Sequence, residues 1–143
     1  MVDVSAKTPT KRTARAAARV RMSPQARAAL EAATLPKGDA FVTAQVAGIL
    51  AAKQTATLIP LCHPLGLDAV DVHFAWEAGG MLRIEATAVT TGPTGVEMEA
   101  LVAASIAALT IYDMTKALDK GITIEQVCLM EKTGGKSGTW QRT

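Results

Sequence analysis

The sequence is poor in cysteine and in aromatic residues. Cys62 and Cys128 are the only cysteines among 143 residues, which is too few for a disulfide framework or for a zinc or iron–sulfur ligand set. The aromatic residues are limited to two Trp, two Phe and one Tyr. The core must therefore be built mainly from Ala, Leu, Ile and Val, and the expected compartment is a reducing cytoplasm.

The chain also lacks a large net charge and an unbroken apolar run long enough to span a membrane. The net charge of +2 is too small to indicate nucleic-acid binding by itself. The N-terminal residues lack the apolar segment of a signal peptide, and Glu99 and Asp113 interrupt the most apolar stretch of the chain. We therefore expect no secretion, no membrane insertion and no nucleic-acid partner.

The sequence does contain an excess of small and medium apolar residues. Hydrophobic residues make up 49% of the chain, which is high for an isolated soluble domain of this length. We expect a single domain spanning residues 1–143 whose surplus apolar surface is covered by other copies of the chain. The composition therefore favours a homo-oligomer.

Local signals predict the order of the elements. Ser23 followed by Pro24 is a helix start, Asp39 is the N-cap of a second helix, and Gly79-Gly80 is typical of a tight hairpin. The expected segments are an irregular arm 1–13, a strand ending at 22, helices from 24 and over 40–53, a stiff loop 54–67, strands 67–76 and 81–90, a helix 94–118 ended by Gly121, a strand 122–131 and a flexible Gly/Lys-rich tail 132–143.

One segment of this order has two interpretations. The end of 15–22 alternates like a strand, whereas Arg15 and Arg19 equally fit an i,i+4 helical pair. With the strand interpretation the order becomes β-α-β-β-α-β. That order predicts an α+β, ferredoxin-like sandwich, in which helices cover one face of an antiparallel sheet.

The helix expected over 94–118 combines apolar character with four charges. It is apolar nearly all the way round, so it must be covered on more than one side. Glu99 and Asp113 share a face of this helix, but they are about 21 Å apart along its axis at 1.5 Å per residue. They therefore either serve opposite ends of a long ligand or belong to two sites that a neighbouring subunit completes.

The charges near each end of this helix also have simpler explanations. Thr94 and Glu97 fit a capping box, which would give Glu97 a structural role as well as a candidate role in the site. Asp113 and Lys116 lie at i,i+3 and fit an ordinary helical ion pair. In an otherwise apolar helix, however, a lysine beside an aspartate also suits proton transfer.

Pro60 and Pro64 stiffen the loop 54–67, and Cys62 and His63 are adjacent between them. Adjacent residues in an extended loop point apart, so the two are not expected to act as one catalytic couple, and His63 is the better candidate. His73 is expected on the solvent face of the hairpin. The counts would allow a zinc site from both cysteines and both histidines, but the spacing matches no known pattern.

The tail contains lysines and glycines that could bind phosphate. Residues 132–138 are not a Walker A motif, because Met130 stands where the first glycine is required. Glycines with Lys132 and Lys136 nevertheless form a flexible cationic strip, and Lys37 precedes a helix N-terminus. Together with His63 and Lys116, these lysines suggest a polyphosphate ligand, although a solvated tail remains the simple alternative.

Six short motifs follow one another along the chain and together suggest a particular family. They are MVDVSAK, KGD, LIPLCHPL, TGVEMEAL, ALTIYDM and KTGGKSG, spanning residues 1–138. In this combination the chain closely resembles the cyclic pyranopterin monophosphate synthase family, the C proteins of molybdenum cofactor biosynthesis. Thr115 stands where some relatives have cysteine, a departure that touches no proposed role.

The resemblance implies a lyase reaction. A radical SAM enzyme upstream makes 3′,8-cyclo-7,8-dihydro-GTP, and the family rearranges this small molecule to cyclic pyranopterin monophosphate with release of pyrophosphate. It also implies a ferredoxin-like subunit in a homohexamer, a trimer of dimers with its active site at a subunit interface. Such chemistry calls for acid–base groups and cations rather than a tightly bound cofactor, with Mg²⁺ only as a companion of the triphosphate.

The resemblance also assigns roles to particular residues. Asp113 would be the catalytic aspartate, with Lys116 beside it as acid or base and Lys37 as a further catalytic lysine. The remaining residues would contact the substrate: Arg12, Leu61, Cys62, His63, Glu97, Met98, Glu99, Lys132 and Lys136. No protein-bound metal is expected.

Two other functions compete with this one. A basic oligomeric module could bind nucleic acid through the arginines of the N-terminal region, Arg12, Arg15, Arg19 and Arg21, and it would show steep salt dependence. A nucleotide-binding regulator of the same fold would bind the ligand without turnover.

Overall fold

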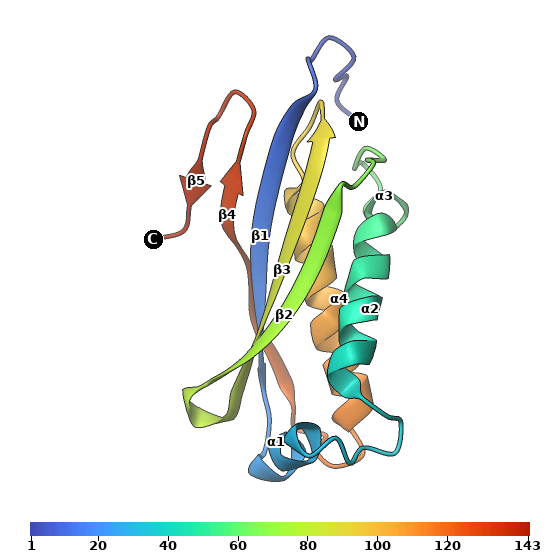
Figure 1. The fold of residues 1–143 in the computed structure, drawn as a ribbon, viewed down its shortest axis with the longest axis vertical. Helices are drawn as coiled ribbons and strands as arrows, with labels where there is room; N and C mark the ends of the chain where they lie inside the picture. The colour runs from blue at the N-terminus through green and yellow to red at the C-terminus, as the bar shows by residue number, and fades with distance from the viewer.

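Helices cover one face of an antiparallel sheet in the computed structural model, which describes residues 1–143 (Figure 1). The elements in chain order are β1 (Thr10–Arg21), α1 (Pro24–Glu31), α2 (Ala40–Lys53), α3 (Thr55–Leu58), β2 (Ala69–Glu77), the 3₁₀ turn η1 (Ala78–Gly80), β3 (Met81–Gly92), α4 (Glu97–Thr115), β4 (Thr123–Thr133) and β5 (Trp140–Gln141). The strands lie in the order β2-β3-β1-β4-β5. The predicted ferredoxin-like α+β class is confirmed.

The central strand is β1, which pairs with β3 on one side and β4 on the other. Ala14, Ala16, Ala18 and Val20 are buried and face the helices, while Arg15 and Arg19 lie on the opposite face of the strand. The helical interpretation of Arg15 and Arg19 is therefore wrong. The pairing with β4 shifts register between Arg15 and Ala16 and between Ala17 and Arg19, which marks bulges or irregularities in this pair of strands.

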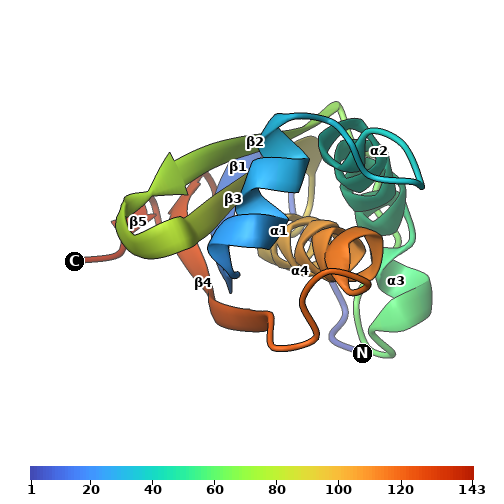
Figure 2. The same ribbon diagram turned by 90° about the horizontal axis from the view of Figure 1, so that it is seen from below.

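The core is packed mainly with small side chains between the sheet and the helix pair α2 and α4. Figure 2 shows both helices on the same side of the sheet. A row of alanines on α4 is completely buried, and Gly48 of α2 lies against it, where an added Cβ would be 3.0 Å from the carbonyl oxygen of Ala103. With few aromatic side chains to fill the interior, the core is instead filled by bringing the backbones of α2 and α4 close together.

Helix α4 is long and apolar enough to cross a membrane by length and composition, with a mean hydropathy of 1.3. Half of that window is buried inside the protein, against α2 and the sheet. This is the position of a core helix, and the expectation that α4 is covered on more than one side is confirmed. Leu109 is the exception, with 53% of its surface exposed.

The predicted starts of the first two helices are confirmed. The Ser23 hydroxyl accepts a hydrogen bond from the amide of Ala26, and the Asp39 carboxylate accepts from the amides of Phe41 and Val42. Each cap satisfies amides that have no partner within the helix.

Both predicted ends of α4 are wrong. Its N-cap is Val96, with no side-chain hydrogen bond, because Glu97 instead accepts a hydrogen bond from Lys132 on β4. The capping box of Thr94 and Glu97 is therefore absent. At the other end the helix stops at Thr115, before Gly121, whose amide donates to the Asp119 side chain in a separate turn.

Three predicted boundaries also differ from the structure. The N-terminal arm is shorter than 1–13, because β1 begins at Thr10. The loop 54–67 contains the short helix α3, which ends before Pro60. The last strand runs on to Thr133, and the chain returns to pair with it as β5, so part of the tail 132–143 is regular structure.

Candidate functional site

The residues singled out from the sequence lie at two ends of α4. The first group surrounds its N-terminal end: Arg12, Leu61, Cys62, His63, Glu97, Met98, Glu99, Lys132 and Lys136. The second group is Lys37, Asp113 and Lys116, near its C-terminal end. Asp113 lines none of the cavities at the first end, as the distance along the helix requires.

The loop after α3 and the first turn of α4 enclose a cavity of about 460 Å³. We call it the Cys62–Glu99 cavity, and its wall includes His63 and Met98. The loop is braced by Pro60 and Pro64, so its side chains meet the start of α4 at a fixed angle. This arrangement offers an apolar surface with carboxyl, thiol and imidazole groups beside it.

Two carboxylates at the start of α4 have opposite protonation preferences. Burial raises the pKa of Glu99, which is only 4% exposed, and the charge of Glu97 raises it further against a hydrogen bond from its own amide. Burial alone would also raise the pKa of Glu97, but hydrogen bonds from Lys132 and its own amide outweigh it and lower the pKa. Glu97 is therefore the ionised partner, while Glu99 retains a proton to higher pH.

The thiol of Cys62 is not activated. Burial raises its pKa, and the nearby charge of Glu99 raises it further. A thiol with a raised pKa is a poor nucleophile at neutral pH. Cys62 therefore contributes to the wall of the cavity rather than attacking a substrate.

His63 holds the N-terminal arm in place. Its Nε2 atom lies 2.7 Å from the carbonyl oxygen of Val2, and Val2 in turn lines the Cys62–Glu99 cavity. No local pattern predicts this contact, because the two residues are 61 positions apart. The arm is thus part of the site.

A second cavity, of about 580 Å³, lies between the arm and the turn after β4. We call it the basic cavity. Its polar side chains are three cations and three hydroxyl groups, from Lys7, Arg12, Lys136, Thr8, Thr10 and Ser137, and no carboxylate lines it. Such a lining suits a phosphate-bearing ligand.

Arg12 is held at the edge of the basic cavity by two hydrogen bonds. Its guanidinium donates to the carbonyl oxygens of Gly92 and Pro93. On the other side, Gly135 adopts a positive φ of 75°, and a Cβ there would collide with the guanidinium. The glycines after Lys132 therefore permit the turn and leave room for Arg12, rather than forming a Walker-type loop.

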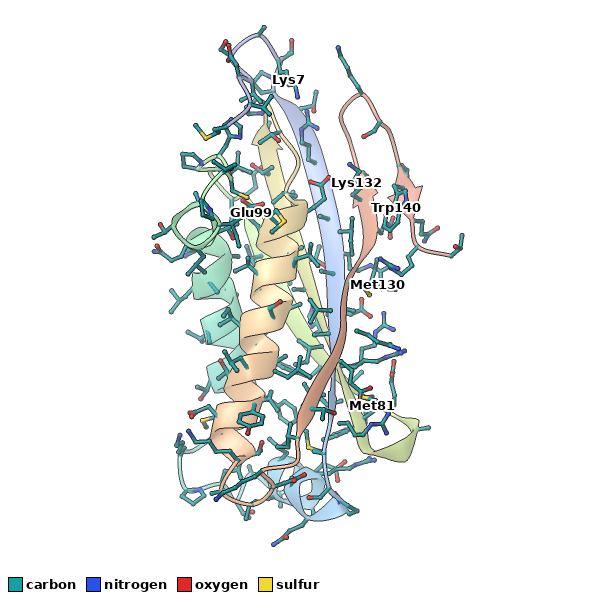
Figure 3. All side chains as sticks on the ribbon, turned by 180° about the vertical axis from the view of Figure 1, so that it is seen from behind. Lys7, Met81, Glu99, Met130, Lys132 and Trp140 are labelled. Carbon is teal, nitrogen blue, oxygen red and sulfur yellow. The ribbon has the colours of Figure 1, made fainter.

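A smaller cavity of about 220 Å³ connects these regions, and we call it the Glu97–Lys132 cavity. The Lys132 ammonium lies 2.7 Å from the Glu97 carboxylate, which joins β4 to the start of α4. Lys132 lines this cavity and Lys136 lines the basic cavity. Figure 3 shows Lys132 at the same end of the molecule as Glu99, a proximity that the sequence around Lys132 does not indicate.

The C-terminal end of α4 carries a separate charged group, which we call the Asp113 cluster. The Asp113 carboxylate lies 2.7 Å from the ammonium groups of both Lys116 and Lys37. Hydrogen bonds from Lys116 and Lys37 lower the pKa of Asp113 to about 2, and Asp113 raises the pKa of Lys116. The predicted ion pair is confirmed, and Lys37 joins it from a position 76 residues away.

The Asp113 cluster is open to solvent. The three side chains are 49% to 52% exposed, and the cavities described above do not include them. An isolated surface ion pair of this kind adds little stability. The cluster therefore presents charged groups outward, without a wall to hold a ligand in the single subunit.

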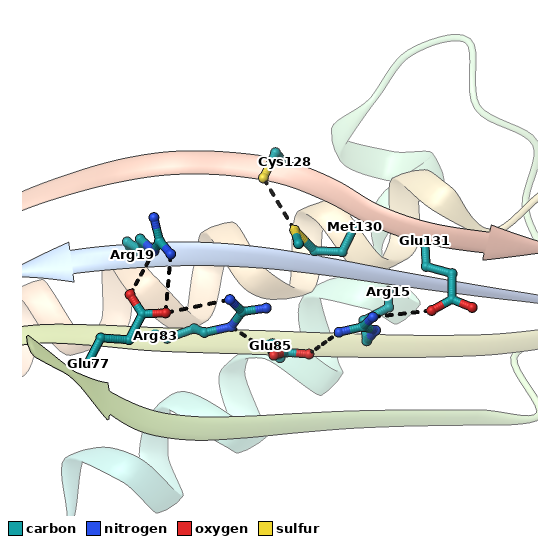
Figure 4. A network of polar contacts seen from close by, with 8 residues as sticks. All are labelled: Arg15, Arg19, Glu77, Arg83, Glu85, Cys128, Met130 and Glu131. Atoms are coloured by element: carbon teal, nitrogen blue, oxygen red, sulfur yellow. Dashed lines mark hydrogen bonds and ion pairs between the residues drawn. The ribbon is translucent and has the colours of Figure 1, made fainter. Parts of the chain in front are cut away.

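The sheet face opposite the helices carries a network of arginines and glutamates (Figure 4). Arg15 bridges Glu85 and Glu131, and Arg19 binds Glu77 at 2.8 Å. Arg21 is likewise paired with a glutamate, and Arg12 donates to carbonyl oxygens. The arginines that would have served a nucleic-acid-binding module are thus already occupied.

The two cysteines and two histidines do not form a metal site. Both cysteines are free, and no group of three or more His, Cys, Asp or Glu side chains is placed to hold a metal ion. His73 is exposed on β2 and does not line the Cys62–Glu99 cavity, as expected for the solvent face of the hairpin.

Comparison with known sequences identifies related proteins over nearly the whole chain. A model described as the MoaC family matches residues 1–135. A protein of Novosphingobium aromaticivorans is 58% identical over 141 residues, covering 99% of this chain and 89% of its own. Proteins of Bacillus velezensis and Bacillus subtilis are 53% and 52% identical, each covering 99% of this chain and 85% of their own. All three are named cyclic pyranopterin monophosphate synthase.

Proposed function

The chain belongs to the MoaC family, and we propose that it catalyses the reaction for which its relatives are named, the formation of cyclic pyranopterin monophosphate in molybdenum cofactor biosynthesis. The substrate is (8S)-3′,8-cyclo-7,8-dihydroguanosine 5′-triphosphate, supplied by an upstream radical SAM cyclase. The products are cyclic pyranopterin monophosphate and pyrophosphate, so the enzyme is a phosphorus–oxygen lyase. The expected compartment is the cytoplasm.

One observation carries this proposal beyond the family name. The Cys62–Glu99 cavity, which has room for a ring system, lies next to the basic cavity, whose polar lining is cationic and hydroxylic. A nucleoside triphosphate derivative has the same two parts, a planar base and a polyanionic chain. The shape and charge of this end of the subunit therefore match the substrate class.

The reaction requires proton transfers and one phosphoryl transfer. During ring opening and closure, Glu99 can donate and recover a proton, because its raised pKa keeps it protonated to higher pH. In the last step a ribose hydroxyl oxygen forms a bond to the α-phosphorus and loses its proton to a base. The bond from the α-phosphorus to the bridging oxygen breaks, and pyrophosphate leaves with that electron pair.

The phosphate chain would be held by cations around the basic cavity. Arg12 and Lys136 line this cavity, and Lys132 lies next to it with its charge shared with Glu97. These groups stabilise the charge of the departing pyrophosphate. No protein-bound metal or tightly bound cofactor is part of the proposal, and Mg²⁺ would be carried by the phosphate oxygens of the substrate.

The Asp113 cluster would act in the active site of a neighbouring subunit. Asp113 stays ionised at neutral pH and holds Lys37 and Lys116, whose ammonium groups can donate protons. Its exposure and its lack of a cavity wall support completion by another copy. The proposed assembly is a homohexamer, a trimer of dimers with the active site at the subunit interface.

An exposed apolar stripe on α2 also supports subunit contact. Val42, Val46 and Leu50 follow each other at i,i+4 spacing and are 50% to 55% exposed. A stripe of this kind on a helix commonly marks a surface that a partner covers. This surface is therefore the first place to look for the neighbouring subunit.

The test of the proposed function is direct turnover. The purified protein is incubated with the cyclised GTP derivative, and both pyrophosphate and the pterin product are measured. The proposal predicts equal molar release of the two. A well-folded protein that binds the compound without forming either product would instead support the nucleotide-binding regulator.

A further inference from the structure

The N-terminal arm places one lysine where three cavities meet. Lys7 lines the Cys62–Glu99 cavity, the basic cavity and the Glu97–Lys132 cavity, and it is the only residue common to all three. It lies at the same end of the molecule as Glu99 and Lys132 (Figure 3). Lys7 therefore borders all the space that a ligand extending from the Cys62–Glu99 cavity into the basic cavity would occupy.

The arm that carries Lys7 has a defined local structure. The amide of Lys7 donates to the carbonyl oxygen of Val4 at 3.0 Å, and the amide of Ser5 donates to the Asp3 carboxylate at 2.9 Å. His63 holds the carbonyl oxygen of Val2. Lys7 therefore lies in a turn. The chain is anchored before this turn by His63 and after it by β1, which begins three residues after Lys7.

Lys7 is also a cation without an anionic partner. Lys37, Lys116 and Lys132 each lie 2.7 Å from a carboxylate, whereas Lys7 makes no ion pair in the structure. The turn fixes the backbone at Lys7, and no protein carboxylate lies within ion-pair distance of its exposed side chain. An unpaired ammonium at the junction of three cavities is suited to an anionic group of a ligand.

We propose that Lys7 binds the α-phosphate of the substrate and stabilises the transition state of pyrophosphate release. This assignment rests on the proposed function. With the ring system in the Cys62–Glu99 cavity and the distal phosphates in the basic cavity, the α-phosphate must lie at the junction between them. Lys136 lines the basic cavity but neither of the other two, so we expect it to bind the β- and γ-phosphates.

The role follows from the charge that develops during the reaction. When the ribose hydroxyl attacks, the non-bridging oxygens of the α-phosphate gather negative charge before the bond to pyrophosphate breaks. A positioned ammonium strengthens its interaction at that point, so it lowers the barrier as well as the dissociation constant. In this role Lys7 interacts with the phosphate oxygens and transfers no proton.

The experiment compares single lysine variants in the turnover assay. We expect Lys7→Ala to lower kcat/KM by roughly 10- to 100-fold, the range for losing one charge-assisted hydrogen bond, with a decrease in kcat as part of it. Lys7→Arg should restore part of the rate, since it keeps the charge. Lys11→Ala is the matched control, because Lys11 is exposed nearby and lines none of these cavities.

Inhibition by pyrophosphate separates α-phosphate binding from general attraction of anions. The proposal predicts that Lys136→Ala weakens pyrophosphate inhibition more than Lys7→Ala does. Equal turnover of the Lys7→Ala and Lys11→Ala proteins would overturn it, and so would a loss of pyrophosphate inhibition in Lys7→Ala as large as in Lys136→Ala. Absence of turnover in the unmodified protein would instead contradict the proposed function itself.

Discussion

At the scale of single residues, the start of α4 separates two carboxylates that are only two positions apart. Glu97 is held ionised by Lys132, while burial favours the protonated form of Glu99. A pair of acids with divided protonation states is a common way for enzymes to have an acid available near neutral pH. Glu97 also connects β4, through Lys132, to the helix that forms the wall of the cavity.

The raised pKa of Glu99 predicts a pH-dependent effect on stability. Because the folded protein holds this proton more tightly than the unfolded chain, stability is full below the ordinary pKa of glutamate and is lost as pH rises through the raised pKa. Glu99→Gln should therefore raise the thermal midpoint at pH 8 more than at pH 4. An equal change at both pH values would show that folding does not raise the pKa of Glu99.

The same substitution tests the role of Glu99 in catalysis. Glutamine keeps the size of the side chain but cannot transfer the proton, so turnover should fall by roughly 10²- to 10⁴-fold, the usual contribution of a general acid. The measurement is kcat for product formation near neutral pH. A rate within a few-fold of the unmodified enzyme would remove Glu99 from the proton-transfer steps.

The pKa of Asp113 is lowered, whereas that of Glu99 is raised. With a pKa of about 2 it remains ionised wherever the protein is folded and active, so the acid limb of the pH–rate profile should not come from this residue. Asp113→Ala and Lys116→Ala should each abolish turnover while leaving the thermal midpoint and the oligomer size nearly unchanged, since both side chains are about half exposed. Near-normal rates in both variants would mean that the cluster is only a surface ion pair.

At the scale of elements, the spacing between α2 and α4 depends on Gly48. The helices approach so closely that a Cβ at this position would contact the backbone of Ala103, and also Val72 at 3.1 Å. The atoms nearest to Gly48 belong to β2 and to the buried face of α4, the helix whose first turn forms the cavity wall. The small side chains of the core therefore determine where α4 presents its charged ends.

This packing predicts that Gly48→Val destabilises the protein. Overpacking a close-packed core costs about 1–3 kcal/mol, and the added methyl groups have no space between the helices. The measurement is the free energy of unfolding in denaturant. Lys53→Val serves as a control on the exposed end of α2, and equal values for the two variants would show that the helices separate without cost.

Local sequence signals predicted most of the elements but few of the contacts in the site. Ser23, Asp39 and Gly79-Gly80 act on their immediate neighbours, so their effects could be predicted. The capping box failed because Lys132, 35 positions away, offered Glu97 a stronger partner. The contacts of Lys37 with Asp113 and of His63 with Val2 depend on how distant elements meet, which no local pattern records.

At the scale of the whole molecule, the two ends of α4 lead to one requirement. The N-terminal end has the cavities, while the C-terminal end has an exposed Asp113 cluster without a cavity of its own. If both ends take part in catalysis, each must meet the opposite end of another copy. Assembly would then be a condition for activity rather than only for stability.

The measurement that tests this most directly is complementation between inactive subunits. Glu99→Gln and Asp113→Ala chains are co-expressed with different tags, and the mixed oligomers are purified and assayed for cyclic pyranopterin monophosphate. With shared sites in each dimer, random pairing should restore about a quarter of the unmodified activity, because half of the dimers then contain one intact site. Mixed oligomers that stay as inactive as either parent would contradict a site built from two subunits.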